Sequence, residues 1–276
     1  MTQKSKSKNF IMHGGILAIA GILVRIIGML YRIPMVNIIG SEGNGLYSVA
    51  FNVYNIVLVL SSYGLPMAVS KLVSARFAVN QYQNVARVFK AALTISLATG
   101  GVAALLMFFG ANWLESTLYS GYMGIAIPLK VLAPTIFIVA VLGVLRGFYQ
   151  GQGTMIPTAI SQLLEQIVNA FVSVFAGYML VNTYRQSAKA SAYGAAGGTL
   201  GTAIGALIAL VFLIIVFVLY KPTFARMVRK DRGRVKEPYS QIYKIMAMTM
   251  IPIILGQTFY QISAVIDDVM LGKVME

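Results

Sequence analysis

The 276-residue sequence contains no cysteine and a single histidine, His13, so it lacks disulfides and the cysteine and histidine clusters that bind zinc. Charge is also scarce, because Asp, Glu, Lys and Arg make up 11% of the chain while hydrophobic residues make up 58%. Acidic side chains are few, with 8 Asp and Glu against 22 Lys and Arg. This balance excludes an ordinary soluble domain, and we expect neither a metal site nor a cofactor.

Apolar runs of about 20 residues recur along the chain, and this is the length that a helix needs to cross a bilayer. The sequence therefore predicts an all-α, polytopic membrane protein with about seven transmembrane helices. The predicted spans are approximately residues 10–38, 45–70, 86–109, 125–147, 156–181, 194–220 and 241–270.

The distribution of positive charge predicts the orientation of these spans, since loops rich in Lys and Arg stay in the cytoplasm. Most cations fall on one side of the membrane: Lys4, Lys6, Lys8, Lys71, Arg76, Arg87, Lys90, Arg146, Lys221, Arg226, Arg229, Lys230, Arg232, Arg234, Lys236 and Lys244. The opposite loops hold Arg185 and Lys189. We expect a multi-pass protein of the cytoplasmic membrane with a cytoplasmic N-terminus. Loop charge accounts for the net charge of +14 without a nucleic-acid partner.

The first span, GGILAIAGILVRIIGMLYRIP at residues 14–34, carries two arginines in an otherwise apolar helix. At about 100° per residue, both fall on a face of small residues. This face comprises Gly14, Ala18, Gly21, Arg25, Gly28 and Arg32. Arg25 lies about 22 Å from Phe10, past the middle of a hydrocarbon core about 30 Å thick. A central arginine is costly, so we predict that it faces a wet cavity or a buried acid. Arg32 can alternatively extend to the outer interface.

The fifth span carries a polar stripe on one face and apolar residues on the other. The stripe consists of Thr158, Ser161, Gln162, Glu165, Gln166, Asn169 and Ser173. We expect it to line a hydrated cavity, although polar contacts between packed helices are the alternative. Glu165 is a candidate partner for Arg25 or a proton carrier, at a depth that differs by about 8 Å from that of Arg25.

Two further helices contribute polar positions to the same expected cavity. The second span supplies Asn52, Asn55 and Ser62, and the seventh supplies Gln257, Gln261 and Asp268. Asp268 can also lie at the outer interface, where an exposed acid is not costly. In contrast, glycines at 197, 201 and 205 predict close helix packing. A mixed but mainly basic cavity suits a diphosphate, which arginine binds through two parallel hydrogen bonds.

Two segments carry a resemblance to a known family. RGFYQGQGTMIPTAISQLLEQIVN at 146–169 and GLYSVAFNVYNIVLVLSSYGLPMAVSKLVS at 45–74 are similar to stretches of the multidrug/oligosaccharidyl-lipid/polysaccharide (MOP) exporter superfamily. The similarity is greatest to its stage V sporulation protein B-like branch, which is related to MurJ-type lipid II flippases. The resemblance implies two helical lobes around a central cavity, and it maps the basic cavity residues of the first helix onto Arg25 and Arg32.

The resemblance also implies a division of the chain. Residues 1–220 would form an N-terminal six-helix lobe, 221–240 a basic cytoplasmic loop, and 241–276 the first helix of an incomplete second lobe. Because a seventh helix stands alone at the end, we expect the chain to be the N-terminal part of a longer protein whose C-terminal lobe is missing here.

The expected function is a flippase for undecaprenyl-diphosphate-linked sugars, either lipid II or a polysaccharide repeat unit, working by alternating access in the lipid bilayer. A cation-coupled multidrug exporter is the main alternative, although Arg25 argues against an acidic cavity. A non-transporting membrane scaffold is a third. A glycosyltransferase is disfavoured because Glu42 and Glu115 lack acidic partners, so we expect no enzyme.

Overall fold

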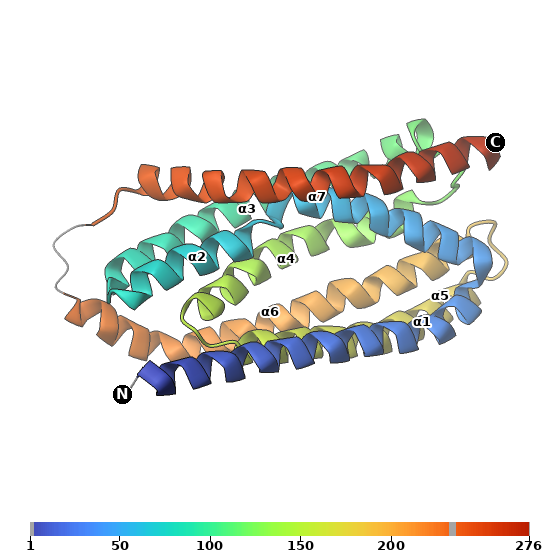
Figure 1. Cartoon of the computed structure of the whole chain (residues 1–276). Coiled ribbons are helices and arrows are strands. Elements are labelled where there is room, and N and C mark those ends of the chain that lie inside the picture. Colours follow the sequence, from blue (N-terminus) through green and yellow to red (C-terminus); the bar gives the residue numbers. More distant parts are fainter. Residues whose placement is uncertain (1–2, 232–235, 276) are drawn as a thin grey trace.

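Long helices dominate the computed structural model, which describes residues 3–231 and 236–275 (Figure 1). The side chains of residues 3–13, 260, 264 and 272–275 lie outside this description, as do Arg232 and Arg234 of the expected basic loop. Within the described ranges the chain forms seven helices and no strand. These are α1 (Gln3–Ser62), α2 (Leu65–Ala78), α3 (Tyr82–Thr117), α4 (Ala126–Gly151), α5 (Ile156–Thr183), α6 (Ala190–Lys230) and α7 (Tyr239–Met275).

Helix α1 contains two predicted spans, because the chain reverses direction inside it at Gly40 (Figure 1). Gly40 has φ 71° and ψ −178°, a backbone conformation that glycine adopts without the cost of a side chain. The expected loop between the first two spans is therefore a single glycine kink. Six stretches of the described chain are long and apolar enough to cross a membrane, and the first, Gly14–Ala78, contains this reversal.

The second span is broken again near its end. After Ser62 a turn at Tyr63 and Gly64 separates α1 from α2, and Pro66 stands in the first turn of α2, where its missing N–H costs little. The interruption is thus caused by a glycine and a proline that are close together. Helix α2 packs closely against α4, since a Cβ added to Gly147 of α4 would lie 2.5 Å from the backbone oxygen of Pro66.

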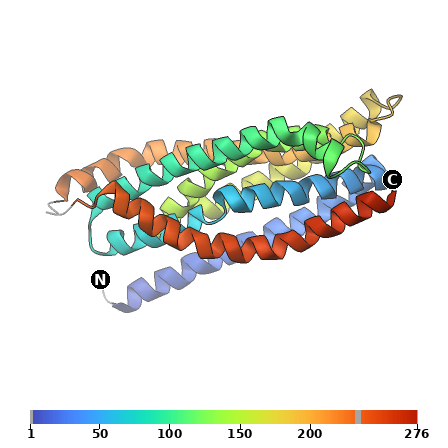
Figure 2. The ribbon, with the colours of Figure 1, turned by 90° about the horizontal axis from the view of Figure 1, so that it is seen from above.

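The two ends of the bundle differ in charge. One end, here called the basic end, carries the turns between α2 and α3 and between α4 and α5, together with the connection from α6 to α7 (Figures 1 and 2). Helix α6 continues through Lys230. The prediction of a loop from residue 221 is therefore wrong at its start, since the apolar helix extends by nearly three further turns with cations on its surface.

Helices α5 and α6 pack through the predicted glycines. A Cβ on Gly197 would lie 2.5 Å from the backbone nitrogen of Gly177, and one on Gly205 would lie 2.5 Å from the backbone oxygen of Glu165. Such backbone approaches require glycine, so the prediction of close packing is confirmed. The contact holds the polar stripe of α5 in a fixed position beside α1.

Candidate functional site

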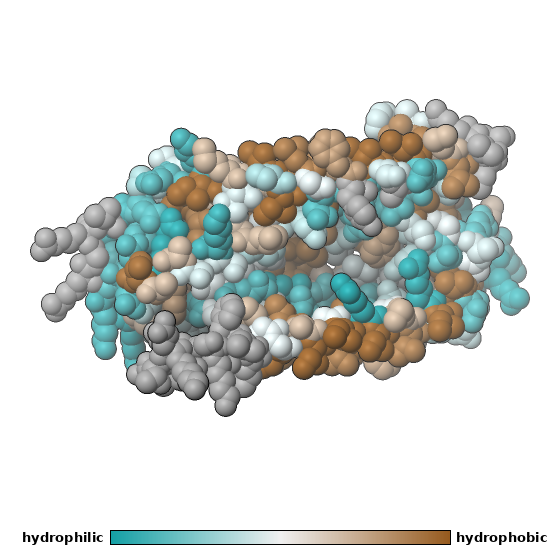
Figure 3. Space-filling model, in the orientation of Figure 1, coloured by the Kyte–Doolittle hydropathy of each residue, from teal (hydrophilic) through white to brown (hydrophobic). Residues whose placement is uncertain are grey.

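A hydrophilic hollow lies on the face of the molecule between α7 and the first half of α1. Figure 3 shows it as a strip of hydrophilic residues between two brown, hydrophobic bands that follow α7 above and α1 below. The bands are apolar because both helices expose large hydrophobic side chains, such as Met29 on α1 and Met248 on α7. Polar groups gathered in a hollow between apolar surfaces are typical of a solute pathway through a membrane protein.

Both arginines of α1 are exposed and lie at the margin of this helix's buried face. On a helix with about 100° per residue, they fall between the side that buries Met35 and Ile39 and the side that exposes Met29. Gly28 lies on the same line as the arginines, and a Cβ there would be 3.2 Å from Nε2 of Gln166. This line of α1 therefore runs beside the polar stripe of α5.

Neither guanidinium group of α1 forms an ion pair with a described side chain. Across the described side chains, the ion pairs are Arg76–Glu237 and Arg146–Glu165, and neither involves Arg25 or Arg32. Arg32 lies within electrostatic range of the Tyr47 hydroxyl. Two arginines outside these pairs make the middle of α1 a candidate site for an anion.

Glu165 is neutralised by α4. Its Oε2 accepts a hydrogen bond of 2.6 Å from Nη2 of Arg146, whose Nε donates to Ser161 Oγ at 3.0 Å. The suggested pairing of Glu165 with Arg25 is therefore wrong, and Arg146 is more than a loop cation. A difference in depth is not the reason why Arg25 and Glu165 are unpaired. Gly28 lies beside Gln166, and at about 1.5 Å per residue this places Arg25 and Glu165 within about 3 Å of each other along the bundle axis.

Much of the α5 stripe is buried between helices. Ser161 is 0% exposed and Asn169 is 8% exposed, so the prediction that both line a cavity is wrong. Asn169 donates to Tyr31 Oη at 3.4 Å, and its Oδ1 lies 2.9 Å from Ser173 Oγ. Asn169 and Ser173 lie against the glycines of α6, and Ser161 hydrogen-bonds to Arg146 of α4. Polar contacts between helices, the alternative considered above, therefore account for these groups. Gln162, Glu165 and Gln166 remain partly exposed.

Helices α1 and α7 meet at a polar contact near the other end. Nδ2 of Asn52 donates to Oδ2 of Asp268 at 2.8 Å. The same helices carry Asn55, Gln257 and Gln261, all partly exposed. Ser62 is 4% exposed and donates to Ser61 Oγ at 3.1 Å, so its prediction as a cavity residue is wrong, because the end of α1 is packed inside the bundle.

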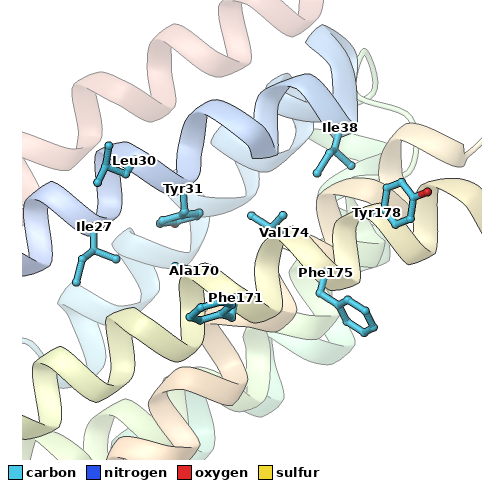
Figure 4. A pocket seen from close by; sticks show the side chains of 9 residues that line it. All are labelled: Ile27, Leu30, Tyr31, Ile38, Ala170, Phe171, Val174, Phe175 and Tyr178. Atoms are coloured by element: carbon cyan, nitrogen blue, oxygen red, sulfur yellow. The ribbon is translucent and has the colours of Figure 1, made fainter.

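An apolar crevice of about 640 Å³ lies on the other flank of α1, against α5 (Figure 4). Ile27, Leu30 and Ile38 of α1 line it together with Phe171 and Phe175 of α5. The arginines do not line this crevice. Its chemistry suits a hydrocarbon chain and leaves the polar hollow as the place for a charged group.

Sequence reasoning missed several tyrosines of the site. Tyr31 and Tyr47, whose hydroxyl oxygens lie 3.4 Å apart, connect α1 to Asn169. Tyr54 lies within electrostatic range of Glu165. Tyrosines in a membrane helix also occur at interfaces, so composition does not mark them as polar contacts.

The role of Arg146 was missed for a related reason. Arg146 stands five residues before Gly151, the last residue of α4. A cation so close to a helix end is usually a topology signal. The sequence therefore does not distinguish an arginine that neutralises Glu165 from one that only marks the cytoplasmic side.

Comparison with known proteins places this architecture in a family. The family model described as "Polysaccharide biosynthesis protein" matches residues 12–276. The chain belongs to this family. Its fold is shared by solved structures described as MOP superfamily transporters.

Two curated relatives of the chain come from Bacillus subtilis (strain 168). The lipid II flippase MurJ is 29% identical over 176 residues, which cover 61% of this chain and 32% of that protein. Stage V sporulation protein B is 35% identical over 153 residues, covering 55% of this chain and 29% of that protein. The chain thus spans about a third of the length of the curated relatives it matches.

Solved structures share the fold at low identity. A MOP superfamily transporter from Pyrococcus furiosus superposes with a TM-score of 0.67 and 18% identity, covering 91% of this chain and 53% of that one. An outward-facing multidrug resistance MATE family transporter gives the same TM-score, identity and coverage. The helices of this polysaccharide biosynthesis family member therefore follow about half of a MOP transporter.

Proposed function

We propose that this chain belongs to a flippase that moves undecaprenyl-diphosphate-linked sugars across the cytoplasmic membrane, with its basic end in the cytoplasm. The observation that carries the proposal is the pair of exposed arginines on α1, which take part in neither ion pair of the described side chains and share the line of α1 that runs beside the polar stripe of α5. The resemblance to MurJ and stage V sporulation protein B supports the class of substrate.

Arg25 and Arg32 are proposed to bind the diphosphate. They are two turns apart, or about 10.5 Å along α1, so a diphosphate between them would be within reach of both extended side chains. Guanidinium groups bind phosphate oxygens through paired hydrogen bonds, which strengthen where water is partly excluded. The neutralisation of Glu165 by Arg146 supports this assignment, because it removes a negative charge that would repel the ligand.

The remaining groups are proposed to guide the sugar. Gln162, Asn55, Gln257 and Gln261 are partly exposed and present amide groups that can exchange hydrogen bonds with hydroxyls. The polyprenyl chain would stay in the bilayer, against the apolar bands on either side of the hollow. Alternating access would require α7 and its lobe to move relative to the first six helices.

A binding experiment tests the proposal. The purified 276-residue chain is incubated in detergent with undecaprenyl diphosphate or with uncharged undecaprenol, and bound lipid is counted by native mass spectrometry. We expect the diphosphate to bind at least about tenfold more tightly, which corresponds to about 1.4 kcal/mol. The R25Q/R32Q variant should lose this preference.

Binding of a cationic dye is measured in a parallel experiment, which tests the alternative of a multidrug exporter. A multidrug exporter would bind the dye, and the R25Q/R32Q variant would bind it as well or better. Equal affinity for undecaprenol and undecaprenyl diphosphate, together with tight dye binding, would contradict the proposal.

A further inference from the structure

A second groove lies between α3 and α6, on the side of the bundle away from α1 and α7 (Figure 2). Its volume is about 470 Å³, and its wall is almost entirely apolar. Phe89 and Phe217 stack in the wall with ring centroids 5.0 Å apart, and Phe89 also contacts Phe148 at 4.7 Å. These ring contacts give the groove a preformed surface.

Three cations surround the groove at the basic end. Lys90, Lys221 and Arg229 line it and are exposed. In the part of the chain that the structure describes, none of them forms an ion pair, whereas Arg76 and Arg146 at the same end are both paired with glutamates. The groove therefore combines an apolar wall with unneutralised positive charge.

The residues that line the groove lie at different distances from the basic end, with the cations closer to it and the apolar residues deeper. Lys90 is eight residues from the start of α3 and Lys221 is nine from the end of α6, so both lie about 12–14 Å from the basic end. Arg229 lies closer to that end, and Leu93 and Phe217 lie about one turn deeper than the two lysines. The charged part of a ligand would thus sit at headgroup level and its apolar part deeper in the membrane.

We propose that this groove binds one anionic phospholipid of the leaflet at the basic end, with its phosphate held by Lys90, Lys221 and Arg229 and an acyl chain against Phe217. Charge complementarity selects an anionic lipid over a zwitterionic one, because basic pockets between transmembrane helices favour anionic headgroups. A lipid held there would bridge α3 and α6. The site is separate from the proposed diphosphate site and does not depend on it.

The test uses the 276-residue chain and lipids with identical acyl chains. Native mass spectrometry in detergent with phosphatidylglycerol or phosphatidylcholine should show one phosphatidylglycerol retained at least about tenfold more strongly. The K90Q/K221Q/R229Q variant should lose this preference. The matched variant K71Q/R226Q/K244Q removes three exposed cations of the same end outside the groove and should keep it.

A variant that fills the groove distinguishes lipid binding in the groove from nonspecific electrostatic attraction between the cations and an anionic lipid. Ala225 lines the groove, so A225W should fill it and release the lipid while all three cations remain. Circular dichroism checks that each variant keeps its helices. Equal retention of both lipids, equal loss in the matched variant, or undiminished binding in A225W would overturn the proposal, as would a mass showing a second copy of the chain in place of the lipid.

Discussion

Arg146 and Glu165 join the end of α4 to the middle of α5 through a contact of 2.6 Å. Their side chains are 16% and 25% exposed, so both charges are partly withdrawn from water. The pair has a consequence for α1, since the acid on α5 that lies close in depth to Arg25 is already neutralised. The arginines of α1 form no ion pair among the described side chains, which is the basis for proposing that they bind an anionic ligand.

Removal of Glu165 should destabilise the bundle. E165Q leaves Arg146 partly buried without its counter-ion, and we expect a loss of about 1–3 kcal/mol in the free energy of unfolding. The double variant R146M/E165L should lose less than the sum of the two single variants, because it leaves no unpaired charge. Thermal unfolding in detergent measures both. Additive losses would show that the pair contributes nothing.

The kink at Gly40 should depend on its backbone conformation. G40A places a side chain on a residue with φ 71° and ψ −178°, a region that is almost restricted to glycine, which should cost about 1–3 kcal/mol. Gly45 is a matched control, because it is helical and a Cβ there would meet nothing within 4 Å. The melting temperature should fall for G40A and stay near the wild-type value for G45A. A similar change in both would contradict the account of the reversal.

Close packing of α5 and α6 should fail when its glycines are enlarged. A side chain on Gly205 would collide with the backbone of α5 at Glu165, so G205L should aggregate or unfold. Gly110 meets nothing within 4 Å and provides the control G110L. Size-exclusion chromatography should give a monodisperse peak for G110L and the wild type but not for G205L. A monodisperse G205L with an unchanged melting temperature would show that the helices can separate at no cost.

The connection between α6 and α7 is held by α2 and α3. Arg76 is 8% exposed and pairs with Glu237, whose backbone nitrogen donates to Asn84 Oδ1 at 3.1 Å. We expect E237Q to weaken this attachment and to increase hydrogen–deuterium exchange in residues 236–242. K236Q, a change at the neighbouring exposed residue, should leave exchange unchanged. Equal exchange in E237Q and the wild type would contradict the attachment.

Patterns that depend on neighbouring residues along a helix were predictable from the sequence. The apolar runs predicted the spans, and the spacing of Gly197, Gly201 and Gly205 predicted close packing. The line of α1 that contains Arg25 was also predictable, since it follows from helical periodicity.

Contacts between distant residues were not predictable in the same way. The polar stripe of α5 is compatible with a cavity or with buried contacts, and the packing of α5 against its neighbours decides between them: Ser161 hydrogen-bonds to Arg146 of α4, and Asn169 lies against Gly205 of α6. Likewise, Arg146 and Glu165 come together because α4 and α5 meet, which no local pattern specifies. The site is therefore less predictable than the helices that carry it.

Because the chain lacks cysteine, a single introduced thiol tests the central claim that the arginine-bearing line of α1 faces a water-filled, anion-binding hollow. Gly21 lies on this line with free space around its Cβ, and Ile22 at the same depth is 58% exposed on the apolar side. In proteoliposomes, a charged methanethiosulfonate reagent should label G21C and leave I22C unlabelled, because thiolate formation needs water.

Undecaprenyl diphosphate should protect G21C from this reagent, and the protection should disappear when R25Q is added. That result would place the anion beside Arg25. Equal labelling of G21C and I22C, or protection that persists without Arg25, would contradict the account.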